Sequence, residues 1–156
     1  MRPSRQRKVL MIKGKIAVIS GSKSDSQIVD TVITILKEFN VNYENKVLSA
    51  HRNAAGLRKY VEGTNADIFI AIAGMAAHLP GAIAALTVKP VIGVPVSGKL
   101  GGLDALLSIV QMPSGVPVAS VAIDNGKNAA LLAIEILALK EPNLLQNLHN
   151  YRKKIS

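Results

Sequence analysis

Residues 68–73 read Ile68-Phe69-Ile70-Ala71-Ile72-Ala73, and this unbroken apolar run decides the fold class. A strand with one face in water alternates apolar and polar residues, whereas a parallel strand that is covered on both faces is apolar throughout. We therefore predict a strand over residues 67–73 that is buried on both sides within a parallel sheet.

Comparable strands are predicted on either side of this one, separated by segments with helical periodicity. The further strands are expected at residues 16–19, 46–48, 91–96 and 116–123. The helices are expected at about residues 25–39, 54–62, 80–86, 104–110, 127–140 and 144–154. This alternation predicts the α/β class, as a doubly wound parallel sheet in a three-layer αβα sandwich, with a last helix that protrudes from it.

The composition limits how the core is built and which sites are possible. The 156 residues are 49% hydrophobic but only 3% aromatic, and they include no tryptophan and no cysteine. Alanine, valine, isoleucine and leucine must therefore fill the core. Neither a disulfide framework nor a thiolate metal site is possible. The absence of cysteine fits a reducing compartment, and we expect a cytoplasmic protein.

The net charge of +9 looks like a signal for nucleic-acid binding until it is located along the chain. Residues 1–15 carry six of the 19 basic side chains and residues 152–154 carry three, whereas the segment between them has ten basic and ten acidic residues. We therefore expect solvated charged ends and no nucleic-acid surface. Residues 1–14 are predicted to be a disordered basic extension, and residues 15–156 a single domain.

We expect neither a signal peptide at the start of the chain nor a membrane-spanning segment. Lys13 and Lys15 interrupt the short apolar stretch at residues 9–12, so a signal peptide is not expected. No run approaches the roughly 20 apolar residues of a membrane span, and we expect no membrane partner. Whether translation starts at Met1 or at Met11 stays open.

The helix expected at residues 127–140 is apolar nearly all round over residues 129–139. Such a helix must be buried on more than one side, and a small domain offers only one. A partner subunit is the expected cover, so we predict a homo-oligomer.

Polar loops follow three of the predicted strands, and the carboxyl ends of parallel strands share one edge of the sheet, where ligands bind. The first loop is Gly21-Ser22-Lys23-Ser24-Asp25. Glycine allows close backbone approach, a following helix N-terminus favours anions, and serine hydroxyls can donate to phosphate. A plain turn in which Ser24 or Asp25 caps the next helix is the alternative. No triphosphate or dinucleotide motif is present.

The second loop is Ser49-Ala50-His51-Arg52. His51 at a strand end can act as a general acid or base near neutral pH, and Arg52 beside it can bind two phosphate oxygens. The alternative is a loop histidine that caps a helix.

The third loop is Gly74-Met75-Ala76-Ala77-His78, which has almost no polar side chains. Its backbone amides could face a ligand while its methyl groups form a small dry space. His78 alone could equally be a packed loop residue. The chain has three histidines and no H-x-x-x-H spacing, so no metal site is expected.

Four stretches, in order and spacing, carry a resemblance to a known family. They are Gly21-Ser22-Lys23-Ser24-Asp25, Ser49-Ala50-His51-Arg52, Ala76-Ala77-His78-Leu79-Pro80-Gly81 and the segment LDALLSIVQMP at residues 103–113. Together they resemble the N5-carboxyaminoimidazole ribonucleotide mutase family of purine biosynthesis. The resemblance implies a flavodoxin-like sandwich, an octamer of identical subunits, and transfer of a carboxylate from the exocyclic nitrogen of a ribonucleotide to C4 of its imidazole. It implies neither metal nor cofactor.

The resemblance also implies a role for each site residue. His51 would be the catalytic proton carrier. The 5′-phosphate would bind to Ser22, Ser24 and Arg52, and the ribose to Asp25. The base and a transient CO2 would be enclosed by the loop from Ala73 to Leu79. The residues implied to bind substrate are Ser22, Ser24, Asp25, Ser49, Arg52, Ala73, Gly74, Ala76, His78 and Leu79.

Two departures from the family pattern are visible. Asn53-Ala54 replaces the usual Thr-Pro, which is expected to loosen the start of the next helix, and Met75 replaces a common glycine, which is expected to narrow the pocket. A sister class carboxylates aminoimidazole ribonucleotide directly with CO2, and it tends to have lysine after the histidine. Arg52 and His78-Leu79-Pro80 favour the mutase, and direct carboxylation is the alternative.

Two functions of other classes compete with an enzyme. A flavodoxin-like nucleotide-binding module would need the phosphate loop but no paired histidines, and a flavin site would want more aromatic residues. A nucleic-acid-binding protein is the third hypothesis, and it rests only on the basic ends.

Overall fold

Residues 12–156 are described by the structure, a computed structural model. The predicted extension at residues 1–14 therefore lies mostly outside the described residues. Ile12 is buried, and its carbonyl accepts a hydrogen bond of 3.0 Å from the side-chain amide of Asn42.

Five parallel strands form one sheet in the order β2-β1-β3-β4-β5. The strands are β1 (Lys15–Ser20), β2 (Asn42–Val47), β3 (Ile68–Gly74), β4 (Val91–Val96) and β5 (Ala119–Ser120). The helices are α1 (Ser26–Glu38), α2 (Ala54–Gly63), α3 (Leu79–Ala84), α4 (Leu103–Val110), α5 (Gly126–Ala138) and α6 (Pro142–Ile155), with a 3-10 turn, η1 (Lys23–Asp25), before α1. The predicted doubly wound sandwich is confirmed, and its strand order is that of the flavodoxin-like folds.

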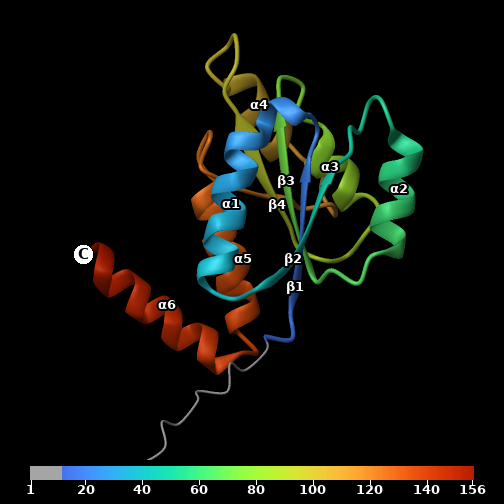
Figure 1. Ribbon diagram of the computed structural model, residues 1–156. Helices are drawn as coiled ribbons and strands as arrows, with labels where there is room; N and C mark the ends of the chain where they lie inside the picture. Colours follow the sequence, from blue (N-terminus) through green and yellow to red (C-terminus); the bar gives the residue numbers. More distant parts are fainter. Residues whose placement is uncertain (1–11) are drawn as a thin grey trace, which may run out of the picture.

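Helices cover both faces of the sheet, with α1 and α5 on one side and α2 and α3 on the other (Figure 1). Successive side chains of β1 enter opposite layers: Ile16 and Val18 pack with α1 and α5, while Ala17 and Ile19 pack with α2, α3 and α4. The residues of β3 alternate in the same way. Two separate cores therefore require both faces of these strands to be apolar, which explains the unbroken runs.

The two edge strands differ from the prediction. The second strand begins at Asn42, earlier than expected, and it carries polar, largely exposed side chains such as Asn45 and Lys46 because only β1 pairs with it. The fifth strand is two residues long instead of spanning residues 116–123. Pro117 lacks the N–H that a ladder needs, and β5 pairs with β4 only at Ala119 and Ser120.

The apolar helix α5 is covered by its own chain on one side. Its small residues and Ile134 are buried within the core shared with α1 and α6. Leu139, just beyond its end, is 85% exposed. Leu131, Leu132 and Ile136 on its other side stay half-exposed, so cover by a partner subunit remains a prediction. The last helix, α6, packs against the end of α1, where the rings of Phe39 and Tyr151 lie 5.5 Å apart. In Figure 1, α6 protrudes from the body of the protein, as predicted.

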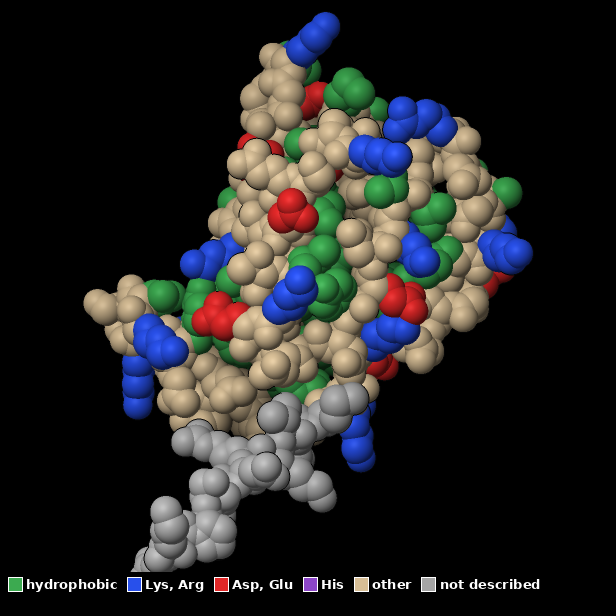
Figure 2. All heavy atoms as spheres, viewed as in Figure 1, with side chains coloured by type: hydrophobic (Ala, Val, Ile, Leu, Met, Phe, Trp, Pro, Cys, Tyr) green, Lys and Arg blue, Asp and Glu red, His purple; other side chains and the backbone are tan. Residues whose placement is uncertain are grey.

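Basic and acidic side chains are scattered over the face shown in Figure 2, which agrees with the even balance of charge between residues 16 and 151. Among residues 12–156, no helix has the length and apolar character to cross a membrane.

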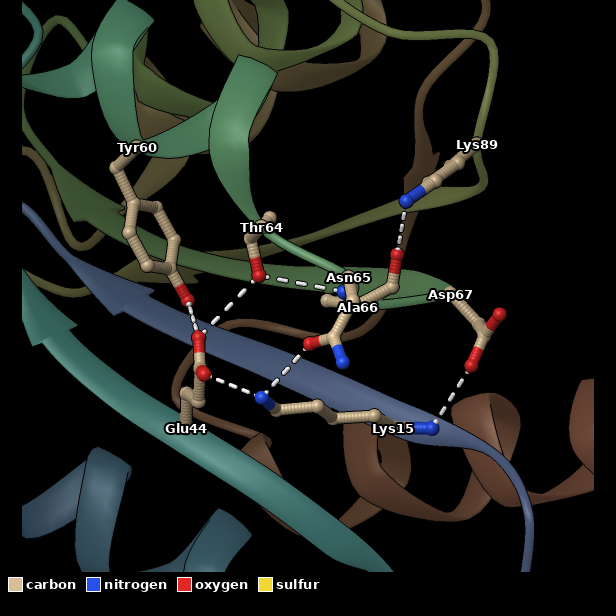
Figure 3. A network of polar contacts seen from close by, with 8 residues as sticks. All are labelled: Lys15, Glu44, Tyr60, Thr64, Asn65, Ala66, Asp67 and Lys89. Atoms are coloured by element: carbon tan, nitrogen blue, oxygen red, sulfur yellow. Dashed lines mark hydrogen bonds and ion pairs between the residues drawn. The ribbon is translucent and has the colours of Figure 1, made fainter.

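A polar network closes the edge of the sheet where β1 begins (Figure 3). The Glu44 carboxylate pairs with Lys15 Nζ and accepts hydrogen bonds from Tyr60 Oη at 2.6 Å and from Thr64 Oγ1 at 3.2 Å. The bond from Lys15, followed by that from Tyr60, lowers the pKa of Glu44 to about 2. Burial, with Glu44 adding to it, raises the pKa of Tyr60 to about 12. The network ties β1, β2 and α2 together.

We expect Glu44→Gln to lower the free energy of unfolding at pH 7 by about 1 kcal/mol, a charge-assisted contribution reduced by partial solvent screening. Because the folded pKa of Glu44 is lowered, its stabilisation is present above the ordinary value of 4.5 and disappears as the pH falls toward 2. Urea unfolding at pH 7 and pH 3 should therefore show a difference that shrinks at the lower pH. Glu62→Gln, which removes an exposed pair with Arg58, is the control and should have little effect. An equal loss at both pH values would contradict an ionic origin.

Candidate active site

The loops that follow β1, β2, β3 and β4 meet at the carboxyl edge of the sheet and surround a cavity of about 420 Å³. All residues implied for the site line this cavity: Ser22, Ser24, Asp25, Ser49, His51, Arg52, Ala73, Gly74, Ala76, His78 and Leu79. A second cavity, of about 610 Å³, lies between α5 and α6. Its lining is mainly apolar, and its charged residues Glu135 and Arg152 pair with each other at 2.6 Å.

The first loop is anchored to β3 and organised by its own hydroxyl groups. The Gly21 amide donates to the Ile72 carbonyl at 3.1 Å. Ser22 Oγ accepts from the Ser24 amide at 3.2 Å and from the Ser24 hydroxyl at 2.9 Å. Ser22 therefore caps η1. The expectation that Ser24 or Asp25 caps the helix is wrong, since Asp25 precedes α1 without a capping hydrogen bond from its side chain.

Asp25 is a carboxylate that the fold partly withdraws from water, with only 9% of the residue exposed. Burial raises the pKa of Asp25 above its ordinary value, and this exceeds the opposing effect of hydrogen bonds from the Ser24 side chain and the Ser22 backbone. Removing water from an ionised group costs free energy that a polar ligand group can offset. The position suits a group that binds hydroxyl donors.

The second loop directs Arg52 across the first. Its guanidinium Nη2 donates to the Gly21 carbonyl at 3.0 Å, while the Arg52 amide donates to Ser49 Oγ at 3.2 Å. Arginine has five N–H donors, so the fork retains donors for an anion. Asn53 Oδ1 accepts from the Gly56 amide at 3.0 Å and caps α2. The start of α2 therefore has a side-chain cap, and whether Asn53-Ala54 makes it looser than Thr-Pro would stays a prediction.

His51 and His78 come from different loops and form one pair. His51 Nε2 and His78 Nδ1 are 2.8 Å apart, and the two rings meet edge to face with centroids 4.8 Å apart. One nitrogen of the pair must donate and the other accept, so a single proton lies between the rings. In residues 12–156, the outer nitrogens, His51 Nδ1 and His78 Nε2, make no protein hydrogen bond. The pair can therefore exchange a proton with a ligand.

The third loop supplies an apolar wall. Ala73 and Leu79 are buried, and Ala76 adds a methyl group to the lining. Met75 has φ of +52° and is 72% exposed. This left-handed conformation favours glycine, which explains why glycine suits the position.

A fourth loop contributes Val96, Ser97 and Gly98 to the lining, and sequence reasoning did not assign these residues to the site. The available signal was positional: a glycine-rich stretch at residues 97–102 follows a predicted parallel strand and must therefore lie on the same edge. It was missed because these residues offer backbone and one hydroxyl group instead of titratable side chains. Within residues 12–156, no cluster of three or more His, Asp or Glu side chains could hold a metal ion.

We expect Asp25→Asn to raise the melting temperature of the ligand-free protein at pH 7, because it removes a buried charge while keeping the shape. A raised folded pKa means that Asp25 contributes stability below its ordinary value of 3.8 and loses it as the pH rises through the folded value. The gain should therefore shrink as the pH falls toward 3.8, as measured by thermal unfolding. Asp30→Asn on the exposed side of α1 is the matched control. A lower melting temperature at pH 7 would mean that the hydrogen bonds of Asp25 outweigh its burial.

Known proteins match both the sequence and the fold. Residues 15–156 match the model of the family described as AIR carboxylase. An N5-carboxyaminoimidazole ribonucleotide mutase of Methanocaldococcus jannaschii is 58% identical over 140 residues, covering 90% of this chain and 89% of the relative. The mutase of Pyrococcus abyssi is 52% identical over 143 residues, covering 89% and 82% of the two chains.

Among solved structures, Treponema denticola PurE has a TM-score of 0.81 at 28% identity and covers 91% of both chains. The fold, the four sequence stretches and the match of the family model over the whole domain agree with one another. On these grounds the chain belongs to the AIR carboxylase family.

Proposed function

We propose that this protein is an N5-carboxyaminoimidazole ribonucleotide mutase, which forms 4-carboxy-5-aminoimidazole ribonucleotide in de novo purine biosynthesis. The observation that carries the proposal is the His51–His78 pair, with nitrogens 2.8 Å apart, beside a loop of hydroxyl groups and a guanidinium. The histidine pair can move a proton, and the hydroxyl and guanidinium groups can hold a phosphate. Relatives at 58% and 52% identity bear the mutase name.

The loops after β1 and β2 hold the ribose 5-phosphate end. Ser22 and Ser24 turn their hydroxyls toward phosphate oxygens, and the Arg52 fork neutralises the charge. Asp25 accepts hydrogen bonds from the ribose hydroxyls, which offset the cost of its burial. Ser49 supports this end because its Oγ accepts from the Arg52 amide at 3.2 Å.

The loop after β3 holds the imidazole and the group that moves. Ala73, Gly74, Ala76 and Leu79 line the cavity with apolar groups and backbone. An apolar wall offers CO2 no water for hydration and slows its escape. This property suits a reaction that frees CO2 for a short time and then captures it again.

His51 then carries one proton through the reaction. As the bond between the exocyclic nitrogen and the carboxylate carbon breaks, His51 gives its proton to that nitrogen, and CO2 leaves with the former carboxylate oxygens. C4 attacks the carbon of CO2 and forms the new bond, after which the C4 proton passes back to His51. No proton is gained or lost overall, and His78 holds the His51 ring in place through the shared hydrogen bond.

An assay with two substrates tests the proposal against direct carboxylation. The carboxyamino ribonucleotide should turn over without added bicarbonate. Aminoimidazole ribonucleotide with bicarbonate should react much more slowly. The reverse preference would favour the carboxylase reaction that the family description names.

The proposal includes an octamer of identical subunits in the cytoplasm, as the resemblance implies. Its support in the fold is an exposed apolar stripe on α4, where Leu103, Leu107 and Val110 are 55%, 46% and 45% exposed at a spacing that places them on one helix face. Contiguous apolar surface of this kind often marks a contact between proteins. Sedimentation of the full chain at micromolar concentration measures the number of subunits.

We expect His51→Asn to lower kcat by at least about a hundredfold, the usual contribution of general acid–base catalysis, while substrate affinity stays within about tenfold. Arg52→Ala should show the opposite pattern, with KM raised at least about tenfold, because one charge-assisted contact is lost. Steady-state kinetics and calorimetric binding separate the two effects.

His149→Asn is the control for this experiment, since His149 is exposed on α6 and does not line the cavity. It should match the parent protein in both constants. Near-normal turnover of His51→Asn would remove the proposed role of His51.

A further inference from the structure

We propose that Asp124 is a positioning residue that holds the loop after β4 as the fourth wall of the site. Asp124 lies in the turn before α5, defined here as residues 121–125, and it does not line the cavity itself. The proposal rests on the proposed function for its kinetic consequences, but the contact on which it depends exists without a ligand.

Two hydrogen bonds join Asp124 to the end of β4. Its backbone amide donates to the Pro95 carbonyl at 2.8 Å, and its Oδ1 accepts from the Ser97 amide at 2.8 Å. Asp124 thus continues the pairing that β5 begins and carries it past the end of the strand. Ser97 and Gly98, the residues directly after this connection, face the ligand cavity.

The backbone of Asp124 is held in a conformation that side chains rarely adopt. Its φ is +59°, and among residues 12–156 only Asn40 and Met75 are other non-glycine residues with positive φ. Aspartate tolerates this region better than most residues, but glycine would adopt it with less strain. A glycine could not make the contact to the Ser97 amide, so the carboxylate compensates for the strained backbone.

A packing contact also supports the same loop at its other end. Gly102 has φ of +85°, and a Cβ there would lie 2.7 Å from the Ile123 side chain and 3.2 Å from Ser97 Cα. Gly102, at the end of the loop at residues 97–102, therefore lies close to both Ile123 and the start of the loop at Ser97. The turn before α5 holds this loop by a hydrogen bond at its start and by close packing at its end.

This arrangement predicts different effects on binding and on chemistry. The reacting histidines are on other loops, so kcat should depend little on Asp124. Substrate affinity should depend on it, because a mobile loop must be ordered when the ligand binds. Ordering this loop when the ligand binds corresponds to about a three- to tenfold loss of affinity, the usual cost of immobilising one additional side chain.

The experiment compares two variants. Asp124→Gly keeps the backbone conformation but loses the oxygen that accepts from the Ser97 amide, whereas Asp124→Asn keeps the backbone conformation and an accepting side-chain oxygen. For the glycine variant, KM of the carboxyamino ribonucleotide should rise about three- to tenfold with kcat within about twofold, and the asparagine variant should restore KM. Asp67→Ala is the matched control. It removes a similar carboxylate contact to a backbone amide, that of Lys15 at 2.9 Å, at the opposite edge of the sheet, and it should leave KM unchanged.

Hydrogen exchange of the Ser97 amide in the ligand-free protein tests the contact apart from activity. Exchange should be faster in Asp124→Gly than in the parent protein and should return toward the parent rate in Asp124→Asn. Unchanged exchange, or faster exchange with an unchanged KM, would overturn the proposal. If the parent protein had no mutase activity, the exchange results would still decide whether Asp124 holds the loop, and the failure would belong to the proposed function.

Discussion

The parallel register of β1, β3 and β4 is the constraint on which the site depends. Ser20 pairs with Ile72, and Gly74 pairs with Val96, so these strands end nearly level at the middle of the sheet. Every loop that leaves them opens on the same edge. Groups far apart in the chain therefore meet at this edge, where contacts between loops, such as that of His51 with His78, fix their positions. The two apolar cores hold the register of the strands from both faces.

The carboxyl edge of the sheet brings a charged side chain, which water would stabilise, next to apolar side chains that exclude water. Asp25 is withdrawn from water, although its charged form is disfavoured there, and the loop after β3 adds an apolar wall. Burial of an ionised carboxylate costs free energy, which its hydrogen bond from Ser24 offsets only in part. The left-handed backbone at Met75 and Asp124 belongs to the same pattern, because both residues lie at or next to the cavity. The opposite edge shows the contrast, since the charges of Glu44 and Lys15 are already satisfied by each other.

The sequence predicted those strands and helices whose apolar residues follow a regular pattern. Residues 16–19 and 68–73 are apolar on both faces, so their burial could be predicted, and the loops after them could be assigned to one edge. The strand at Asn42 was placed too late because an edge strand has no apolar pattern. The cap supplied by Ser22 and the contact between His51 and His78, which are 27 residues apart, depend on loop geometry that no period reveals. Ser97 was missed for another reason, because its loop lines the cavity with backbone and one hydroxyl group and has no titratable side chain.

In the proposed reaction, the carboxylate moves within one enclosed pocket and does not mix with the CO2 and bicarbonate of the solvent. Carboxyamino ribonucleotide labelled with 13C in its carboxylate, turned over in a large excess of unlabelled bicarbonate, tests this claim directly. We expect the C4 carboxylate of the product to keep the label, as read by NMR or mass spectrometry. A product whose label is diluted to the level of the bicarbonate would contradict the enclosed transfer and would favour carboxylation by CO2 from solution.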